Sequence, residues 1–456
     1  MNVRRFASAS QALALLFAVS SLNSVYAVET KGPLAEYVAK PDSSYKWVKR
    51  QERELGGVKF VELTLTSQTW KTGPWKHQLF VIRPAELPET SHALILISGG
   101  AWKDELEAPP KDGDSLPGEA PVLAQAVKML KVPVALLCQV PNQPIMGGLT
   151  EDEAISQSFV EFLNTGDLEW PLLLPMTKSA VKAMDAVQEF AKQEWKADIK
   201  SFTVTGASKR GWTTWLTGAV DPRATAIAPI VIDTLNMQAQ MPHQLKSWGK
   251  YSEQIEDYTR RGIQQQAGTP RGVQLNGIVD PYHYRAELTQ PKLLIMGTND
   301  RYWTLDALNL YWPDLQGEKR ILYVPNNGHG VNDFARILGS IGALHKQAAG
   351  ELELPRLTWE FKDGPEQVTL AIKSDKTPHK VDIWSATAAT RDFRDSKWTS
   401  QPATLVDGEY RFDYKTPTEG FAAFFGEAVY RDGAAPYFFS TNLRIIEPAA
   451  EKTAGK

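Results

Sequence analysis

The chain has 456 residues, of which 43% are hydrophobic and 23% are charged, so it is long enough for a large apolar core and two or three domains. Its formal net charge is −3, and no block of like charges interrupts the sequence, so nothing indicates a nucleic-acid-binding surface. The one cysteine, Cys138, excludes an internal disulfide. Its place in the apolar run 132–139 predicts burial as a small hydrophobic residue.

The first 27 residues are predicted to be a signal peptide. They begin with Arg4 and Arg5, continue with the apolar segment 12–19 (ALALLFAV), and end in a fair cleavage signature at 25–27 (VYA). The apolar segment is too short to span a bilayer, and no later stretch approaches the required length. We therefore expect an exported protein, periplasmic or secreted, without a membrane span.

The middle of the chain alternates predicted strands and helices. Two alternating segments, 58–66 and 77–83, are separated by Gly73 and Pro74 and predict an antiparallel hairpin at the edge of a sheet. Further strands are predicted at 93–98, 132–139, 202–205, 225–232, 292–297 and 319–324, and helices at 120–130, 176–195, 209–219 and 331–349. This alternation predicts an α/β domain over residues 28–353, with a mostly parallel sheet and helices on both faces.

Two segments, 141–175 and 235–288, interrupt this alternation. Both follow predicted strand ends, where inserted segments can form a lid over a site. From 354 to 447, short strand-like runs separated by Asp-Gly turns predict a second domain, an immunoglobulin-like β-sandwich. Residues 448–456 are predicted to be a disordered tail.

The stretch 201–215 (SFTVTGASKRGWTTW) has the pattern of a nucleophile elbow. Residues 202–205 predict a buried strand, the turn from Gly206 to Gly211 has Ser208 at its apex, and a helix follows. Such a turn strains the serine backbone, and small flanking residues let strand and helix approach closely. Free N–H groups at the helix N-terminus suit a developing oxyanion. Ser208 is therefore the candidate nucleophile.

A serine hydroxyl needs a base, and the base needs an orienting carboxylate. Asp300 follows the strand at 292–297, and His329 lies on a tight loop after the strand at 319–324. Ser, acid and His occur in the chain order of α/β-hydrolases, and all three follow C-terminal strand ends on one edge of the predicted sheet. Asp233, after the strand at 225–232, is the alternative acid.

The oxyanion hole is expected from the backbone N–H of Lys209 and from the loop that contains Gly100 and Ala101. Three further side chains are predicted to contact substrate: Trp102, His283 and Tyr302. The sequence has no paired cysteines, no H-x-x-x-H and no carboxylate cluster at metal spacing. We therefore expect neither a metal nor another cofactor.

Several stretches of the sequence resemble the PhoPQ-activated pathogenicity-related protein family. They are 204–237 (VTGASKRGWTTWLTGAVDPRATAIAPIVIDTLNM), 291–303 (PKLLIMGTNDRYW), 323–330 (YVPNNGHG), 140–144 (VPNQP) and 174–190 (LPMTKSAVKAMDAVQEF). The resemblance extends from about residue 35 to 445. The family is similar to α/β-hydrolases of the prolyl-oligopeptidase and acyl-peptidase type, which implies a reaction class without a substrate. Motif by motif, it implies Ser208, Asp300 and His329 as the triad.

The elbow departs from the G-x-S-x-G pattern, because Arg210 occupies the place of the second glycine and Gly211 comes one residue later. This resembles the G-x-S-R-x-G elbow of glucuronoyl esterases, in which the cation after the serine assists the oxyanion. Lys209 is placed to do the same. Peptidases of the dipeptidyl type instead hold a free amine with carboxylates, and residues 151–153 (EDE) are either such a group or a solvated helix start.

The sequence thus predicts an exported serine hydrolase that forms an acyl-enzyme on Ser208 with a small ester or peptide substrate. Peptidase-like and esterase-like activities both stay open, including a glucuronoyl-esterase-like carbohydrate esterase. The alternative of another class is a secreted signalling or adhesion protein on a catalytically inactive hydrolase fold. The sequence leaves the oligomeric state and the role of the sandwich open.

Overall fold

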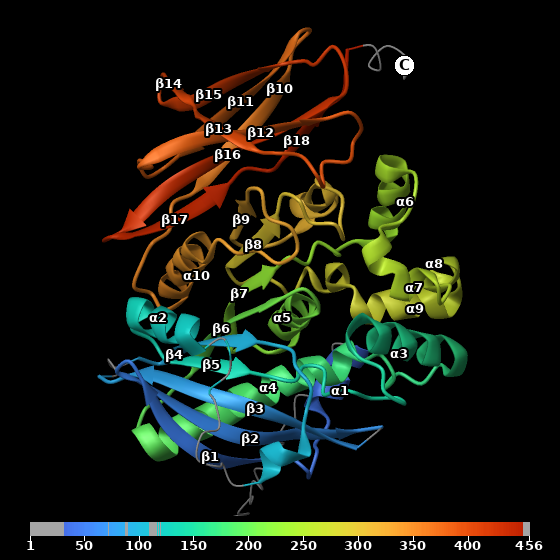
Figure 1. Cartoon of the computed structure of the whole chain (residues 1–456), viewed down its shortest axis with the longest axis vertical. Helices are drawn as coiled ribbons and strands as arrows, with labels where there is room; N and C mark the ends of the chain where they lie inside the picture. Colours follow the sequence, from blue (N-terminus) through green and yellow to red (C-terminus); the bar gives the residue numbers. More distant parts are fainter. Residues whose placement is uncertain are drawn as a thin grey trace, which may run out of the picture.

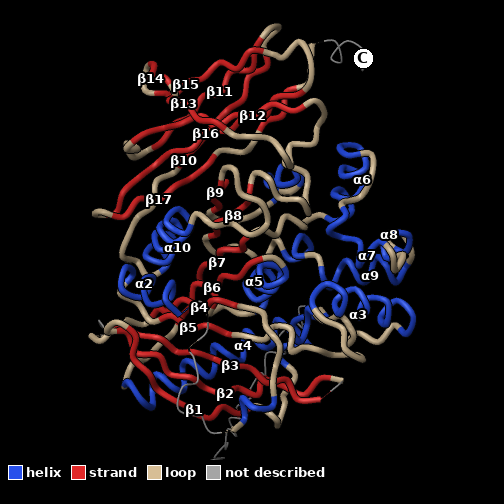
Figure 2. The backbone as a smooth tube through the Cα atoms, viewed as in Figure 1, coloured by secondary structure: helices blue, strands red, loops and turns tan. Residues whose placement is uncertain are grey.

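The computed structural model describes residues 32–71, 73–86, 90–108, 116, 118 and 120–449. The predicted signal peptide and most of the predicted tail lie outside these residues. The described chain folds around a 14-stranded mixed sheet that runs through the whole molecule (Figures 1 and 2). None of the described helices is long and apolar enough to cross a membrane.

Six parallel strands form the centre of this sheet. In spatial order they are β5 (Val134–Leu137), β4 (His92–Ile97), β6 (Ser201–Ala207), β7 (Ala224–Ile230), β8 (Lys292–Gly297) and β9 (Lys319–Val324). Every residue of β8 is buried, as expected of a continuous apolar run that is covered on both faces. The predicted α/β class and the parallel arrangement of these strands are confirmed.

The predicted hairpin is present, but it is not the edge of the sheet. β2 (Val58–Trp70) pairs antiparallel with β3 (Gly73–Pro84), and β1 (Lys46–Leu55) pairs antiparallel with the outer side of β2. The sequence of β1, KWVKRQEREL, carries too many charges to have been predicted as a strand. Charged residues are common on edge strands, because they discourage pairing with other chains. The predicted edge position of the hairpin was therefore wrong.

Helices cover both faces of the central sheet (Figure 1). α1 (Pro33–Ala39), α4 (Leu173–Phe190) and α5 (Lys209–Val220) contribute to one apolar core, and the short π-helix η2 (Ala191–Trp195) extends α4. α2 (Ala120–Leu130) and α10 (Phe334–Ala348) contribute to the core on the opposite face. Cys138, just after β5, is buried in this second core, as predicted.

The two predicted insertions form helices that gather on one side of the molecule, at the right of Figure 1. The first contributes α3 (Glu151–Thr165), and the second contributes α6 (Met237–Trp248), η3 (Glu253–Ile255), α7 (Glu256–Thr259), α8 (Ile263–Gln266), α9 (Pro270–Val279) and η4 (Pro281–Tyr284). α3 contacts α7, α8 and α9, so the two insertions pack as one layer. Three more 3-10 turns are η1 (Asp104–Glu107), η5 (Ala307–Leu310) and η6 (Trp312–Asp314).

The C-terminal strands form two sheets, one of which continues the central sheet. β17 (Ala435–Ser440), β16 (Phe421–Asp432), β12 (Lys380–Ala388) and β13 (Thr399–Pro402) follow β9 in order, and β18 (Arg444–Ile446) also pairs with β16. The other sheet is β10 (Leu357–Asp363), β11 (Gln367–Ser374), β15 (Glu409–Lys415) and β14 (Thr404–Val406). Phe424 of β16 packs on Tyr414 of β15, so the sheets face each other. The immunoglobulin-like type stays a prediction.

Candidate active site

Ser208 lies at the sharp turn between β6 and α5. Its backbone angles are φ 57° and ψ −127°, a strained conformation that costs a non-glycine residue about 1–3 kcal/mol. Two glycines permit the turn: a Cβ on Gly206 would lie 2.8 Å from the carbonyl of Arg210, and one on Gly211 would lie 2.6 Å from a methyl group of Ile232. Gly211, one position later than in G-x-S-x-G, therefore provides the close contact between helix and strand.

His329 and Asp300 are in contact. The imidazole Nδ1 is 2.8 Å from Oδ2 of Asp300, and Oδ1 of the same carboxylate accepts the backbone N–H of Tyr302 at 2.9 Å. The ring of Tyr302 lies over the imidazole, with centroids 4.1 Å apart. The Nε2 atom is buried and has no hydrogen-bond partner among the described residues, the hydroxyl of Ser208 included. Carboxylate and aromatic ring thus orient the imidazole and leave one nitrogen unengaged.

The acid loop (residues 298–303) and the histidine loop (residues 325–330) are bonded to each other. The backbone N–H of Asn299 donates to the carbonyl of Asn327 at 2.9 Å. A Cβ on Gly297 would lie only 2.5 Å from that carbonyl oxygen, so glycine is needed for the loops to approach. The bond between Asp300 and His329 therefore rests on a short, rigid connection between two neighbouring strand ends.

A segment that the sequence did not predict as functional supports both loops. This brace segment (residues 391–398, RDFRDSKW) follows β12. The side-chain amide of Asn299 donates to the carbonyl of Ser396 at 2.7 Å. Asn326 donates to the carbonyl of Trp398 at 3.0 Å and accepts its N–H at 2.8 Å. The charged sequence of the segment is typical of an exposed loop, so no signal in the sequence marked this role.

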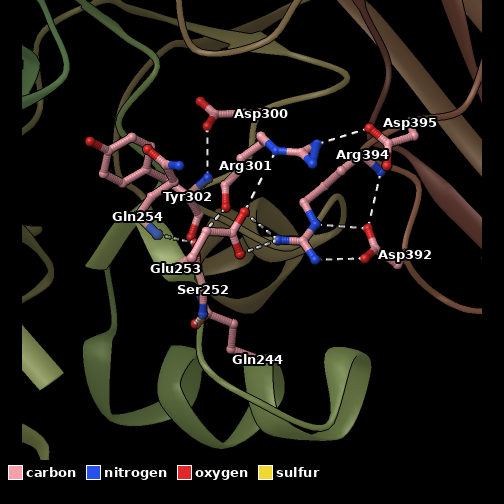
Figure 3. Close-up of polar contacts among 10 residues, drawn as sticks. All are labelled: Gln244, Ser252, Glu253, Gln254, Asp300, Arg301, Tyr302, Asp392, Arg394 and Asp395. Carbon is pink, nitrogen blue, oxygen red and sulfur yellow. Dashed lines mark hydrogen bonds and ion pairs between the residues drawn. The ribbon is translucent and has the colours of Figure 1, made fainter. Parts of the chain in front are cut away.

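The brace segment also binds the layer of inserted helices, as Figure 3 shows. Arg394 pairs with Glu253 of η3 at 3.0 Å and with Asp392 at 2.6 Å. Arg301 of the acid loop pairs with Asp395 at 2.9 Å and is 3.6 Å from Glu253. Such partly exposed ion pairs contribute at most about 1 kcal/mol each. Their effect is to align three segments that are far apart in the sequence.

Further contacts join the same three segments. The side chain of Gln244 in α6 donates to the carbonyl of Tyr302 at 2.9 Å, and the hydroxyl of Ser252 donates to the carbonyl of Arg301 at 2.6 Å. The guanidinium of Arg394 lies 4.2 Å from the ring centroid of Trp248. The inserted helices are therefore fastened directly to the loop that carries Asp300.

Asp233, the alternative acid, does not contact His329. Its carboxyl group is buried and accepts a hydrogen bond from the hydroxyl of Tyr311 at 2.6 Å. Burial raises the pKa of Asp233 to about 7, although the bond from Tyr311 acts in the opposite direction. The structure therefore brings Asp300, and not Asp233, to the histidine.

The side chains of Lys209 and Arg210 point to carboxylates of α3. The ammonium of Lys209 lies 3.0 Å from Glu151 and 3.2 Å from Asp152, and Arg210 binds both carboxylate oxygens of Glu151 at 2.7 Å. Burial raises the pKa of Glu151, but the hydrogen bonds and charge of Arg210, with that of Lys209, outweigh it and lower the pKa to about 2. The ammonium is thus engaged by carboxylates, whereas the backbone N–H of Lys209 has no intrahelical partner.

The predicted oxyanion loop lies beside the elbow. Gly99 contacts the guanidinium of Arg210 so closely that a Cβ there would clash. Gly100 has a φ of 108°, and Ala101 forms a single parallel bridge with Gln143. Arg210 therefore contacts this loop as well as the start of α3, which the glycine of a G-x-S-x-G elbow could not do.

A cavity of about 670 Å³ is lined by Ser208 and His329 at one place and by the inserted helices elsewhere. Two of the three predicted substrate contacts, His283 and Tyr302, line it as well, whereas Trp102 does not. The described part of the chain contains no group of three or more His, Cys, Asp or Glu residues that could hold a metal ion. The cavity therefore brings together a serine hydroxyl, an imidazole and a large lining surface from the inserted helices.

The fold is that of an α/β protein with a mixed sheet, and the candidate site lies at the C-terminal ends of its parallel strands. The family described as PhoPQ-activated pathogenicity-related protein matches residues 34–394, and the chain belongs to this family. It is 32% identical over 454 residues to autocrine proliferation repressor protein A of Dictyostelium discoideum, over 92% of this chain and 89% of that protein. The resemblance found in the sequence is confirmed.

Solved structures of similar fold include two esterases. An acetyl xylan esterase from Paenibacillus sp. R4 has a TM-score of 0.45 and 13% identity, over 66% of this chain and 88% of that chain. A glucuronoyl esterase from Solibacter usitatus has a TM-score of 0.41 and 12% identity, over 69% of this chain and 91% of that chain. Likeness at this level does not bear on the chemistry of the present chain.

Proposed function

We propose that the protein is a serine hydrolase in which Ser208 is the nucleophile, His329 is the base and Asp300 orients the histidine. One observation carries the proposal. Ser208, strained at a helix N-terminus, lines the same cavity as His329, whose Nδ1 is held by Asp300 at 2.8 Å and whose Nε2 has no partner among the described residues. Hydrogen bonds between nucleophile and base are often long in ligand-free structures and tighten when substrate binds.

In the first half of the reaction, the Ser208 oxygen attacks the carbonyl carbon of the substrate while Nε2 of His329 takes the hydroxyl proton. The bond to the leaving group then breaks, His329 returns the proton to that group, and the acyl group stays on Ser208. In the second half, water attacks the acyl-enzyme and gives its proton to the same nitrogen. The serine is regenerated and the acid is released.

We assign the backbone N–H of Lys209 to the stabilisation of the negative oxygen of the tetrahedral intermediate, because it lies directly after the proposed nucleophile at the start of a helix. A second donor from the Gly100-Ala101 loop stays a proposal. The ammonium of Lys209, held by Glu151 and Asp152, is not assigned a part in the oxyanion hole.

The same ion pairs favour an esterase over a dipeptidyl type of peptidase. A peptidase of that type needs carboxylates that are available for the substrate amine. Glu151 is bound by Arg210 and Lys209, Asp152 is bound by Lys209, and Glu153 pairs with Arg260 at 2.7 Å. We therefore infer hydrolysis of an ester of a small molecule.

Covalent labelling with a fluorophosphonate tests the nucleophile. Wild-type protein should be labelled and should hydrolyse a p-nitrophenyl ester, and Ser208→Ala should do neither while its melting temperature stays nearly unchanged. Ser400→Ala, which changes an exposed serine on β13, is the matched control and should behave like wild type. Equal labelling of wild type and Ser208→Ala would refute the assignment.

A second candidate function is extracellular signalling without catalysis, which the name of the Dictyostelium relative favours. Purified Ser208→Ala protein separates the two. A repressor of cell proliferation that acts only by binding should keep its effect on responsive cells when the serine is lost. We also propose that the chain is exported after removal of residues 1–27. Sequencing the N-terminus of the exported protein should place Val28 first.

A further inference from the structure

We infer that the cavity beside Ser208 holds the acyl group of the substrate, and that this group is uncharged, mostly apolar and much larger than acetyl. The inference rests on the proposed function, since it concerns the acyl group that the substrate transfers to Ser208. Cavities of 300–1,000 Å³ enclose whole small-molecule ligands, and this one measures about 670 Å³. An acetyl group would leave most of it empty.

The wall away from Ser208 is built from apolar side chains of several elements. Phe159 comes from α3, Trp212 from α5, Met241 from α6, Ile263 from α8 and Leu275 from α9. Apolar surface gains free energy when it is removed from water, in proportion to the area buried. A wall of this composition binds hydrocarbon or aromatic rings more strongly than sugar hydroxyls, which would lose their hydrogen bonds to water there.

The charged groups on the wall already have partners. Asp152 binds the ammonium of Lys209 and the hydroxyl of Tyr258, at 2.9 Å. The carboxylate of Asp280 accepts three backbone N–H groups: Asn236 at 3.2 Å, Met237 at 2.8 Å and Tyr282 at 2.9 Å. A uronic acid would be buried without a counter-charge at a large cost, and an amino acid with a free amine would meet only carboxylates whose oxygens already accept other hydrogen bonds.

Two buried polar atoms of the lining have no partner among the described residues, besides Nε2 of His329. They are Nε1 of Trp303 and the side-chain oxygen of Gln264. The acyl group is therefore expected to tolerate one or two neutral polar atoms along its length. A mostly apolar lining with a few fixed polar groups is typical of small-molecule sites.

Two apolar side chains of the lining are also exposed to solvent. Leu245 of α6 is 40% exposed and Val273 of α9 is 59% exposed, so apolar surface continues from the cavity to the outside of the inserted helices. Such a rim lets an apolar chain enter without first crossing a polar surface. The leaving group is assigned to the other side of Ser208. During deacylation the acyl group still fills the cavity, so water cannot reach His329 through it. Water must therefore enter through the space that the leaving group has vacated.

A series of p-nitrophenyl esters tests the acyl group. We expect kcat/KM to rise about fourfold for each added methylene from acetate through butanoate to octanoate, so that octanoate exceeds acetate at least 100-fold. An ester whose octanoyl chain ends in a carboxylate should have a kcat/KM at least 100-fold below that of the unmodified octanoate ester. A flat or falling series with Ser208 still labelled by fluorophosphonate would overturn this inference alone. Absence of both labelling and turnover would overturn the proposed function as well.

Octyl acetate and ethyl octanoate separate the acyl group from the leaving group. The two esters have the same number of carbon atoms, and ethyl octanoate should be the better substrate by at least tenfold. A preference for octyl acetate would assign the cavity to the leaving group and overturn the inference.

A variant that fills the cavity gives an independent test. Ile263→Trp replaces a branched aliphatic side chain on α8 with a larger indole ring, at a position where the side chain is only partly buried. It should lower kcat/KM for octanoate at least tenfold. Its kcat/KM for acetate should fall at least fivefold less than that for octanoate, because an acetyl group fills only a small part of the cavity, and Ser208 should still be labelled by fluorophosphonate. Leu405→Trp, at a 59% exposed position on β14, is the matched control and should change neither ester. Equal loss for both esters in Ile263→Trp would contradict the assignment.

Discussion

Opposite ends of the same parallel strands carry histidines in opposite settings. At the C-terminal ends, His329 is 28% exposed and lies 2.8 Å from the carboxylate of Asp300. At the N-terminal ends, His92 begins β4 and packs against His345 of α10, with ring centroids 4.6 Å apart. Both of these rings are buried, and their hydrogen-bond partners are hydroxyl groups, including that of Thr203 at 2.9 and 3.1 Å.

Burial controls the charge of the second pair. It lowers the pKa of His92 to about 4 and that of His345 to about 3, with neighbouring charges adding to the effect on His345. Both rings are therefore neutral at neutral pH and serve the packing of α10 on the sheet. The comparison teaches that the surroundings distinguish the two kinds of histidine: a carboxylate orients the partly exposed imidazole of His329, the proposed base, whereas hydroxyl groups are the hydrogen-bond partners of two buried imidazoles that stay neutral.

The largest expected effect concerns the carboxylate. Asp300→Asn should lower kcat about 10⁴-fold, because an amide at this position favours the wrong tautomer of His329. Asp233→Asn changes a carboxyl group that does not touch the histidine and should alter kcat by less than about threefold. Steady-state kinetics on one ester measures both. If Asp233→Asn were the more damaging change, the acid would have been assigned to the wrong strand.

The two ends should also differ in the sign of their pH dependence. Asp233 has a folded pKa of about 7, above its usual value, so its contribution to stability is present below pH 4 and is lost as the pH rises through 7. Relative to wild type, Asp233→Asn should therefore gain about 4 kcal/mol of unfolding free energy between pH 4 and pH 8. Urea unfolding at several pH values measures the difference. A constant difference would show that this carboxyl group ionises normally.

His345→Gln should show the opposite slope. The folded pKa of His345 lies below its usual value, so the contribution of the neutral ring is present above pH 6.5 and is lost as the pH falls. The variant should therefore gain about 1.4 kcal/mol on wild type for each pH unit between 6 and 4. Whatever constant loss of packing accompanies the substitution, kcat should stay within twofold. A loss of activity at unchanged stability would break the distinction between the two ends.

Changes to the contacts of the brace segment should affect only the end of the sheet that carries the proposed active site. Asn326→Gly keeps a residue that accepts the positive φ of 57° and removes the two hydrogen bonds to Trp398. We expect kcat to fall about tenfold with little change in KM, and stability to fall by about 1–3 kcal/mol, since the N–H of Trp398 loses its partner. A drop in stability without a drop in kcat would make the brace purely structural.

The smallest expected effect concerns Lys209. Lys209→Met keeps the backbone N–H and removes an ammonium that binds Glu151 and Asp152, so kcat should change by less than about threefold, well under the 10²–10³ of a lost oxyanion donor. Stability should fall by about 1–3 kcal/mol, less than for a fully buried pair, because Glu151 keeps Arg210 and is partly exposed. A 100-fold loss of kcat would restore the glucuronoyl-esterase analogy.

The sequence by itself determined the central strands, the elbow and the order of Ser208, Asp300 and His329. These features depend on local rules: continuous apolar runs form buried strands, a serine between glycines forms a strained turn, and consecutive parallel strands end at one edge. It did not decide between Asp233 and Asp300, because both follow strand ends. Only the contact between the acid loop and the histidine loop decided that.

Tertiary structure alone decided the surroundings of the site. The brace segment lies more than 60 residues from either loop in the sequence, and its charged residues have no local pattern that distinguishes an exposed loop from a support. The ion pairs of Lys209 and Arg210 likewise depend on α3, which is about 50 residues earlier. Local rules determine which elements form and what their ends present. Packing between distant segments determines which partner a charged side chain binds. For Lys209, that packing decided that the ammonium pairs with carboxylates of α3 and does not face the proposed oxyanion hole.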